Sequence, residues 1–239
     1  MTFPFQEKLD DDSFTKLKLL RKKIKNLGTA CVAYSGGVDS TLIAAIAQEQ
    51  LGSNSIAITG VSPSLAPHLL EEARAQAKWL GIKHKEIFTY EIKNPDYFKN
   101  PENRCFACKT ELHNLLKKFT NELEYSKVLD GINFDDLGDF RPGIKAAKLA
   151  NVKSPLAELK INKCTIRKIS KSLGFPWFDK PSQPCLASRF PYGESITTIK
   201  LNKVAKAEHW LHINGFPKVR VRVQGLSAKI ELPANRIQE

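Results

Sequence analysis

The chain has 239 residues, of which 42% are hydrophobic and 26% are charged, proportions typical of a globular protein with a sizeable core. It contains no run of about 18 apolar residues and begins with an acidic segment, so we expect neither a membrane span nor a secretory signal. The net charge of +12 suits nucleic acid and phosphate-rich small molecules equally. Five cysteines without an export signal predict a cytoplasmic protein with thiol or metal chemistry.

The N-terminal part of the chain alternates helical and strand-like patterns. A first helix is predicted over residues 13–27, with Ser13 as its N-cap. Its apolar face comprises Phe14, Leu17, Leu20 and Ile24. The pattern continues with strand 30–34, helix 40–51, strand 55–61, helix 66–80, strand 84–89, helix 108–120 and strand 128–131. Strands separated by helices are typical of parallel βαβ units, so we expect an α/β fold with a doubly wound parallel sheet over residues 1–150.

The pattern changes after about residue 150. The predicted elements there are helix 162–174, a turn-rich segment over 176–193 with four prolines, helix 196–214, and alternating strands 219–223 and 228–232. A helix followed by a β-ribbon differs from the alternation of the first half. This order predicts a second, smaller α+β domain over residues 151–239.

The segment Ser35-Gly36-Gly37-Val38-Asp39-Ser40 joins the first predicted strand to the next helix. Its two glycines permit positive φ angles and keep side chains away from a ligand. Backbone N–H groups at the helix start can then converge on an anion. Ser35 and Ser40 can donate to phosphate oxygens, and Asp39 can hold Mg²⁺. The carboxyl ends of parallel strands meet at one edge, which would also hold residues 60–62 and 131–136.

This loop lacks the lysine of the Walker motif. It resembles instead the pyrophosphate loop of the N-type ATP pyrophosphatases, the PP-loop superfamily. That resemblance implies an adenine-nucleotide-hydrolase-like fold, with ATP and Mg²⁺ as cofactors. In this superfamily ATP is cut between its α and β phosphates, and AMP is passed to a carbonyl or carboxylate oxygen.

Cys105 and Cys108 form a CxxC motif at a predicted helix start, where the helix N-terminus favours the thiolate. Alone, the motif fits a redox pair, half a zinc site or two ordinary helix residues. Cys185 lies in the proline-rich segment and is a candidate for chemistry. Three thiolates fit a [4Fe–4S] cluster with one open iron better than incomplete zinc ligation. We assign Cys31 to the core and Cys164 to a structural role.

Arginines mark the C-terminal part of the chain. Arg220 and Arg222 alternate along a predicted strand and therefore point to the same face, although a solvated strand face carries arginine equally well. Arg189 follows Cys185 by four residues and can add a third cation beside it. Three planar guanidinium groups suit the recognition of phosphate or carboxylate.

Four further motifs make the resemblance more specific. They are Asp130-Gly131-Ile132-Asn133, Asp139-Phe140-Arg141-Pro142-Gly143, the segment Pro184–Gly193 and the segment Gly215–Arg222. Together with the pyrophosphate loop they resemble the LarE family over most of the chain. LarE enzymes complete the nickel-pincer cofactor of lactate racemase. They adenylylate the carboxylates of pyridinium-3,5-biscarboxylate mononucleotide and replace an oxygen of each with sulfur.

The resemblance implies roles for individual residues. Single-cysteine members give up the sulfur of the loop cysteine, which becomes dehydroalanine, whereas three-cysteine members hold a [4Fe–4S] cluster that can carry an extra sulfide. Cys105, Cys108 and Cys185 match the second type, so we expect a catalytic and not a sacrificial protein. The remaining implied site residues are Ser35, Gly36, Gly37, Val38, Asp39 and Ser40 with Gly131 and Arg141 for the nucleotide and its magnesium, and Arg189, Glu208, Arg220 and Arg222 for the substrate.

The implied partners are a small phosphorylated pyridinium substrate and other enzymes of nickel-pincer cofactor synthesis. We also expect a homo-oligomer, and we expect no contact with membranes or nucleic acid. The chain ends shortly after Pro233, where family members usually continue with a further strand and helix. The sequence therefore represents either a truncated chain, with a second domain incomplete at its C-terminus, or a short variant of the family.

Two alternatives stay open. A tRNA 2-thiolation enzyme can also pair a pyrophosphate loop with three cysteines around a [4Fe–4S] cluster, and the net charge of +12 favours it. Those enzymes usually carry lysine where Val38 stands and lack the string Arg189-Phe190-Pro191-Tyr192-Gly193. A nucleotide-binding protein without transfer activity is the other alternative, and it leaves the three cysteines unexplained.

Overall fold

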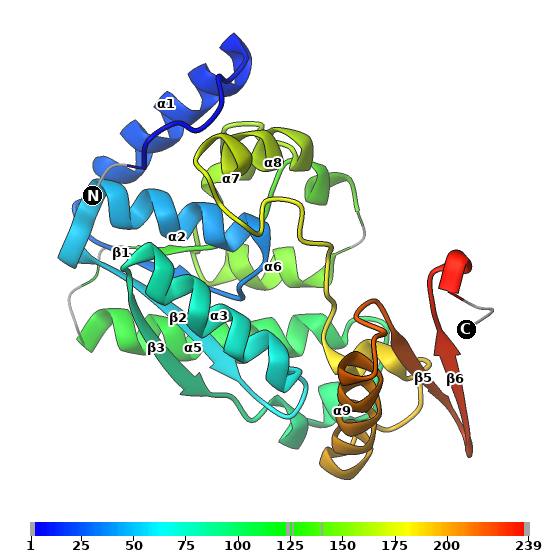
Figure 1. Ribbon diagram of the computed structural model, residues 1–239. Coiled ribbons are helices and arrows are strands. Elements are labelled where there is room, and N and C mark those ends of the chain that lie inside the picture. Colours follow the sequence, from blue (N-terminus) through cyan, green and yellow to red (C-terminus); the bar gives the residue numbers. More distant parts are fainter. Residues whose placement is uncertain (1–2, 123–124, 126, 140, 237–239) are drawn as a thin grey trace.

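Four parallel strands form the central sheet of the computed structural model, which describes residues 3–122, 125, 127–139 and 141–236 (Figure 1). The strands are β1 (Ala30–Ala33), β2 (Ser55–Val61), β3 (Lys83–Phe88) and β4 (Val128–Leu129), in the order β3-β2-β1-β4. All three neighbouring pairs are parallel, with Cys31 of β1 opposite Ile56 and Val128. The predicted parallel α/β sheet is therefore confirmed. Phe140 of the Asp139–Gly143 motif lies outside the described residues, as do residues 1–2 and 237–239 of the two predicted domains.

Helices cover both faces of this sheet (Figure 1). One face packs against α1 (Asp11–Lys25), α2 (Val38–Leu51), α3 (Pro67–Leu80), α7 (Pro155–Glu158) and α8 (Lys163–Ser172). The other face packs against α5 (Arg104–Glu122) and α6 (Pro142–Leu149). Because side chains alternate along a strand, Val32 enters the first core and Cys31 the second. Cys31 is fully buried, which confirms its assignment to the core.

The first helix differs from its prediction in two ways. Its N-cap is Asp10, whose carboxylate accepts a hydrogen bond from the Ser13 N–H at 2.8 Å, so Ser13 itself lies inside the helix. Phe14 is 39% exposed and not part of the buried face. Its ring packs instead on Phe5 of the preceding segment, with ring centroids 6.1 Å apart.

The C-terminal part adds a helix and a β-ribbon. Helix α9 (Thr198–Ile213) packs against β5 (Arg220–Gln224), which pairs in antiparallel fashion with the outer strand β6 (Ser227–Glu231). A separate apolar cluster joins these elements to Leu69 of α3 and to Tyr97 of the short helix α4 (Pro95–Phe98). The predicted domain boundary at residue 150 stays a prediction, and α7 and α8 pack in the first core beside α1 and α2.

Short elements complete the chain. The 3₁₀ turns are η1 (Gly52–Asn54), η2 (Glu91–Lys93), η3 (Asp135–Gly138), η4 (Leu186–Arg189) and η5 (Ala234–Arg236). Helices α4, α6 and α7 are absent from the prediction, and each begins with a proline, Pro95, Pro142 or Pro155, in its first turn. Among the described helices, none combines the length and the apolar character needed to cross a bilayer.

Candidate active site

The loop between β1 and α2 has the strand–turn–helix geometry that the sequence predicts. Gly36 takes a φ of 68°, and a Cβ there would lie 3.1 Å from the Cα of Ala73 in α3, so this position requires glycine. Gly37 is the extended N-cap of α2, with φ of −76° and no side-chain cap. The first N–H groups of α2 therefore lack intrahelical partners at the carboxyl edge of the sheet, where an anion can accept from them.

The side chains of the two loop serines are hydrogen-bonded to each other. The hydroxyls of Ser35 and Ser40 lie 3.1 Å apart, and the Ser40 hydroxyl also accepts from the Ser35 N–H at 3.2 Å. Both predicted phosphate donors thus face the same point of the loop. If a phosphate oxygen bound there, the two hydroxyls could donate hydrogen bonds to it in place of the bond between them.

Asp39 stands in the first turn of α2 and has one free oxygen. Its Oδ2 is paired with the ammonium of Lys163, whereas its buried Oδ1 has no hydrogen-bond partner among the described residues. Burial raises the pKa of this carboxyl above its ordinary value, and the nearby charge of Asp136 acts in the same direction. A buried oxygen without a donor suits a hard cation, so the site fits one protein ligand for Mg²⁺, with phosphate oxygens and water as the others.

Two lysines reach this loop from the C-terminal half, and the sequence analysis missed both. Lys163 pairs with Asp39, and its own N–H donates to the Asp135 carboxylate at 2.8 Å. The Lys180 ammonium donates to the Gly36 carbonyl at 3.0 Å and pairs with Glu72 of α3 at 2.5 Å. The two cations flank the loop, where they can neutralise charge on phosphate groups.

Gly131 and Arg141 both lie at the carboxyl edge of the sheet, but they differ in what they contact. A Cβ on Gly131 would lie 2.6 Å from the Ser40 nitrogen, so this glycine allows β4 to end directly against the pyrophosphate loop. Arg141 pairs with Asp136 at 2.8 Å and with Asp139 at 3.2 Å. Its half-exposed guanidinium is within reach of a ligand at the loop, whereas Gly131 acts through packing.

Gly131→Ala should therefore damage the loop. The added methyl group has no room beside the Ser40 backbone, so we expect unfolding to become easier by about 1–3 kcal/mol. ATP-dependent activity should fall with it, since the N-terminal turn of α2 must move. Gly138→Ala is the matched control, because a Cβ there meets no atom within 4 Å. Chemical denaturation of both variants decides the point: equal stability of the two would contradict this packing role.

The three candidate thiols come from two segments that are tied together. Cys105 and Cys108 lie in the first turns of α5, and Cys185 immediately precedes η4. Asn100 connects the segments, since its side-chain amide donates to the Pro191 carbonyl at 2.7 Å and its oxygen accepts from Arg104 at 2.8 Å.

The surroundings of Cys108 and Cys185 both disfavour the thiolate. Burial, followed by the charge of Glu91 and of the other two thiols, raises the pKa of Cys108 to about 12. Cys185 as a residue is exposed, but protein groups around its thiol remove water from it. This desolvation, followed by the charge of Cys105, raises the pKa of the thiol. The expectation that the helix start would favour the thiolate is therefore wrong for Cys108, because desolvation outweighs the helix dipole.

The remaining cysteine, Cys164, is exposed in the first turn of α8. Helix α8 turns Ile166 and Ile169 toward the core and leaves this thiol outside, and its predicted structural role stays a prediction. Within the described ranges, no three histidine, cysteine or acidic side chains stand in a ready-made metal-binding arrangement.

Arg189 and Glu208 form a buried ion pair beneath the Cys185 loop. Two guanidinium nitrogens of Arg189 donate to the two Glu208 oxygens at 2.8 and 2.9 Å, and the third donates to the carbonyls of Pro184 and Cys185. Glu208 Oε1 also accepts from the Val221 N–H at 2.9 Å. Arg189 is thus a cation beside the Cys185 loop whose charge is paired with Glu208.

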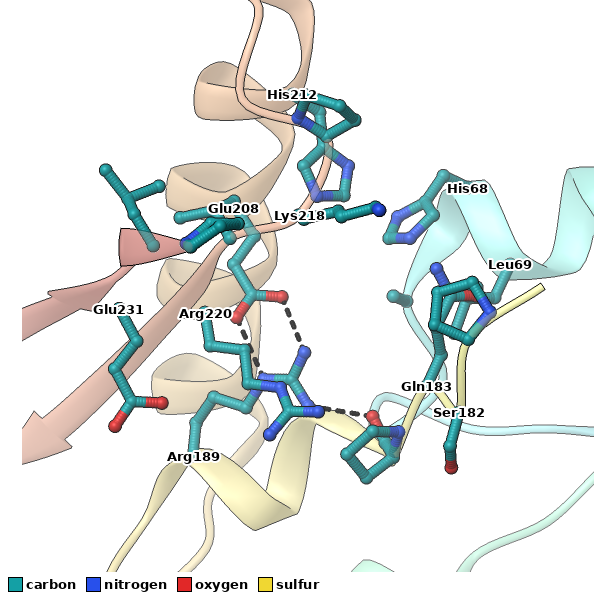
Figure 2. A pocket seen from close by; sticks show the side chains of 17 residues that line it. His68, Leu69, Ser182, Gln183, Arg189, Glu208, His212, Lys218, Arg220 and Glu231 are labelled. Carbon is teal, nitrogen blue, oxygen red and sulfur yellow. Dashed lines mark hydrogen bonds and ion pairs between the residues drawn. The ribbon is translucent and has the colours of Figure 1, made fainter. Parts of the chain in front are cut away.

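The two arginines of β5, Arg220 and Arg222, differ in their contacts. Arg222 donates to the Ser188 carbonyl at 2.5 Å and to the Glu231 carboxylate at 2.9 Å, which fixes the loop to the β-ribbon. Arg220 lines a pocket between α3 and α9, together with Arg189 and Glu208 (Figure 2). Of the predicted substrate arginines, Arg220 is the one whose side chain is not occupied by a neighbour among the described residues.

Comparison with known proteins places these features in context. Residues 15–119 match the family model described as NAD synthase. The chain is 34% identical to the pyridinium-3,5-bisthiocarboxylic acid mononucleotide synthase of Lactiplantibacillus plantarum, over 93% of this chain and 81% of that protein. It is 55% identical to an uncharacterized protein of Synechocystis, over 94% of this chain and 84% of the other. An uncharacterized protein of Methanocaldococcus jannaschii is 32% identical over 89% of this chain and 81% of its own length.

Proposed function

Because the chain belongs to the LarE-type pyridinium-3,5-bisthiocarboxylic acid mononucleotide synthases, within the PP-loop superfamily, we propose that it uses ATP to thiolate the carboxylates of a pyridinium mononucleotide. One observation carries this proposal: the segment from Asp136 to Gly143 lies between the pyrophosphate loop and the first turns of α5, where Cys105 and Cys108 stand. Asp136 lies near Asp39 and pairs with Arg141, and Gly143 lies against Lys109 and the Cys105 carbonyl. Nucleotide activation and sulfur transfer can therefore occur side by side.

In the first step, a substrate carboxylate oxygen attacks the α-phosphorus of ATP. The bond from that phosphorus to the bridging oxygen breaks, pyrophosphate leaves, and a carboxyl–AMP anhydride forms. The N-terminus of α2, Lys163 and Lys180 stabilise the charge that develops on the pyrophosphate. Mg²⁺ held by Asp39 would shield the same oxygens.

In the second step, sulfur replaces AMP at the activated carbonyl. Carboxylate oxygen is a poor leaving group, whereas AMP departs readily when a sulfur nucleophile attacks. The loop that carries Cys185 is held in place by the Arg189–Glu208 pair and by Arg222. These residues orient the thiol segment toward the substrate.

Cys105, Cys108 and Cys185 would be the ligands of a [4Fe–4S] cluster, since three thiolates leave one iron open for an exchangeable sulfide. Because the described side chains hold no ready-made metal-binding arrangement, cluster binding would have to draw the three thiols together. The pKa values of Cys108 and Cys185 are raised, so metal binding must release protons from these two thiols. The three-cysteine chain would then supply sulfur repeatedly without losing its own.

The products of ATP test the proposal directly. With a pyridinium carboxylate mononucleotide and Mg²⁺, the protein should form AMP and pyrophosphate in equal amounts, because the loop is of the pyrophosphatase type. Chromatographic detection of ADP and orthophosphate would contradict the assignment. A parallel reaction with tRNA tests the alternative substrate: tight, steeply salt-dependent tRNA binding and tRNA thiolation would replace the mononucleotide with RNA.

A further inference from the structure

Residues 3–9 precede α1 and form an N-terminal strap across the C-terminal end of α8. The Gln6 N–H donates to the Ser172 carbonyl at 2.6 Å, and the Ser172 hydroxyl donates to the Glu7 carbonyl at 2.5 Å. The Glu7 carboxylate also pairs with Lys171 at 2.9 Å. Two hydrogen bonds and an ion pair thus fix the strap to the end of this helix.

The strap carries one buried aromatic side chain, Phe3, which is 6% exposed. Its ring lies parallel to that of Trp79 in the last turn of α3, with centroids 5.9 Å apart. It stands edge to face with Phe175, which follows α8, at 5.4 Å. Trp177 lies 5.2 Å from Trp79 and 5.8 Å from Phe175. These four rings form one aromatic cluster, in which Phe3 covers Trp79 and Phe175.

The aromatic cluster anchors the turn that carries Lys180. The Lys180 N–H donates to the Trp177 carbonyl at 3.0 Å, so the backbone of this lysine is bonded to a member of the cluster. The Lys180 side chain is 12% exposed, and its ammonium donates to the Gly36 carbonyl at 3.0 Å. Gly36 is the residue of the pyrophosphate loop with a positive φ. The position of this cation at the loop therefore depends on the position of Trp177.

Helix α3 connects the same cluster to the loop by a second route. Glu72, Gln76 and Trp79 are spaced by four and three residues and therefore share one face of this helix. The Glu72 carboxylate pairs with the Lys180 ammonium at 2.5 Å. The Gln76 oxygen accepts from the hydroxyl of Thr41, in the first turn of α2, at 3.0 Å. The cluster thus fixes both the backbone of Lys180 and the helix that supplies its carboxylate partner.

We propose that the N-terminal strap is part of the ATP site, because Phe3 holds the aromatic cluster closed and thereby positions Lys180 for the phosphates of ATP. A lysine that is held in place before a phosphate binds has less rotamer freedom to lose on binding. Phe3 is a positioning residue, since it acts through Trp177 and Lys180 and does not touch the nucleotide. The inference rests on the proposed function, in which Lys180 stabilises charge on the pyrophosphate.

Calorimetry with α,β-methylene-ATP and Mg²⁺ measures nucleotide binding without turnover. Phe3→Ala should weaken this binding about tenfold, because the ligand then has to order Lys180 and the turn beneath it. Phe5→Ala is the matched control, since Phe5 belongs to the same strap but is 46% exposed and packs on Phe14. Its affinity should stay within about twofold of wild type, as for most surface substitutions.

A double-mutant cycle separates positioning from a general loosening of the fold. Lys180→Met removes the cation, so adding Phe3→Ala to it should cause no further loss of affinity. Lys163→Met is the comparison, because Lys163 also reaches the loop but pairs with Asp39. In that background Phe3→Ala should still weaken binding about tenfold.

The state of the cluster is measured on the same variants. Phe3→Ala should shift the tryptophan emission to longer wavelength, because Trp79 and Trp177 become more exposed, and Phe3→Leu should restore most of the affinity by covering them again. Unchanged affinity in Phe3→Ala, or an equal loss with and without Lys180, would overturn the inference. Should Phe3→Ala fail to fold, Phe3→Val enters the same cycle under the same criteria.

Steady-state kinetics distinguish the inference from the proposed function. In Phe3→Ala the KM for ATP should rise about tenfold, whereas the KM for the pyridinium mononucleotide should stay at the wild-type value. If the ATP analogue binds with the expected coupling to Lys180 but no AMP is formed, the positioning role stands and the proposed function is wrong. If the wild type thiolates the mononucleotide and Phe3→Ala binds the analogue equally well, the function stands and the role of the strap is wrong.

Discussion

Asp39→Asn should reduce ATP–pyrophosphate exchange by about a thousandfold, the scale expected when a residue that positions and shields the developing phosphate charge is removed. The carboxylate has one oxygen paired with Lys163 and a second, buried oxygen without a donor, so it is the group at the loop best placed to hold Mg²⁺. Asparagine keeps the shape of the side chain but loses its negative charge. The exchange reaction, measured with labelled pyrophosphate across a range of Mg²⁺ concentrations, reports this loss directly.

The same substitution should leave the fold intact. The raised pKa of Asp39 means that the folded state favours its protonated form, so the ionised carboxylate costs stability above the unfolded-state pKa. Asparagine removes that cost at neutral pH, and the difference should fade as the pH falls toward 4, near the ordinary aspartate value. Lys163 is one-third exposed and can turn to water. An exposed carboxylate on α1, changed by Asp12→Asn, is the control, and more than a tenth of wild-type exchange in Asp39→Asn would refute the metal role.

The sequence was sufficient for the pyrophosphate loop because this site is local. The strand, the turn glycine at Gly36 and the start of α2 lie within one short segment, and the alternating pattern correctly predicts the parallel sheet. The lysines at the loop were missed because they lie 124 and 144 positions from their partners Asp39 and Gly36. No spacing rule connects such residues, and the packing of α8 and of the segment after it brings them there.

The cysteines show where local rules fail. A helix start predicts a lowered thiol pKa, but burial and the charge of Glu91 act in the opposite direction on Cys108. Cys164 looks equivalent in sequence because it also begins a helix, yet it is exposed. Arg189 follows Cys185 by four residues in the sequence, and only the structure shows that Glu208, nineteen positions away, pairs with it. For Cys108 and Arg189 the deciding partner comes from another element.

The largest expected effect concerns the three thiols as ligands of one [4Fe–4S] cluster. Cys105→Ala, Cys108→Ala and Cys185→Ala should each remove cluster iron, visible absorbance and multiple-turnover sulfur transfer together. Asn100 and Arg104 tie the two thiol segments, so the loss of one thiol should leave the other two in place without a stable cluster. Anaerobic purification, followed by iron and sulfide analysis and a visible spectrum, measures this outcome independently of activity.

Cys164→Ser is the matched control, because Cys164 is an exposed thiol at a helix start and should retain cluster and activity. Cys31→Ser is less suitable, since it places a hydroxyl in a fully buried apolar position at a cost of about 1–3 kcal/mol. The sacrificial alternative predicts that Cys185 becomes dehydroalanine, so that each chain transfers sulfur once and loses the mass of one H₂S. Intact-mass measurement decides between them: that mass loss, with Cys105→Ala still active, would show that Cys185 donates its own sulfur and that the CxxC thiols hold no cluster.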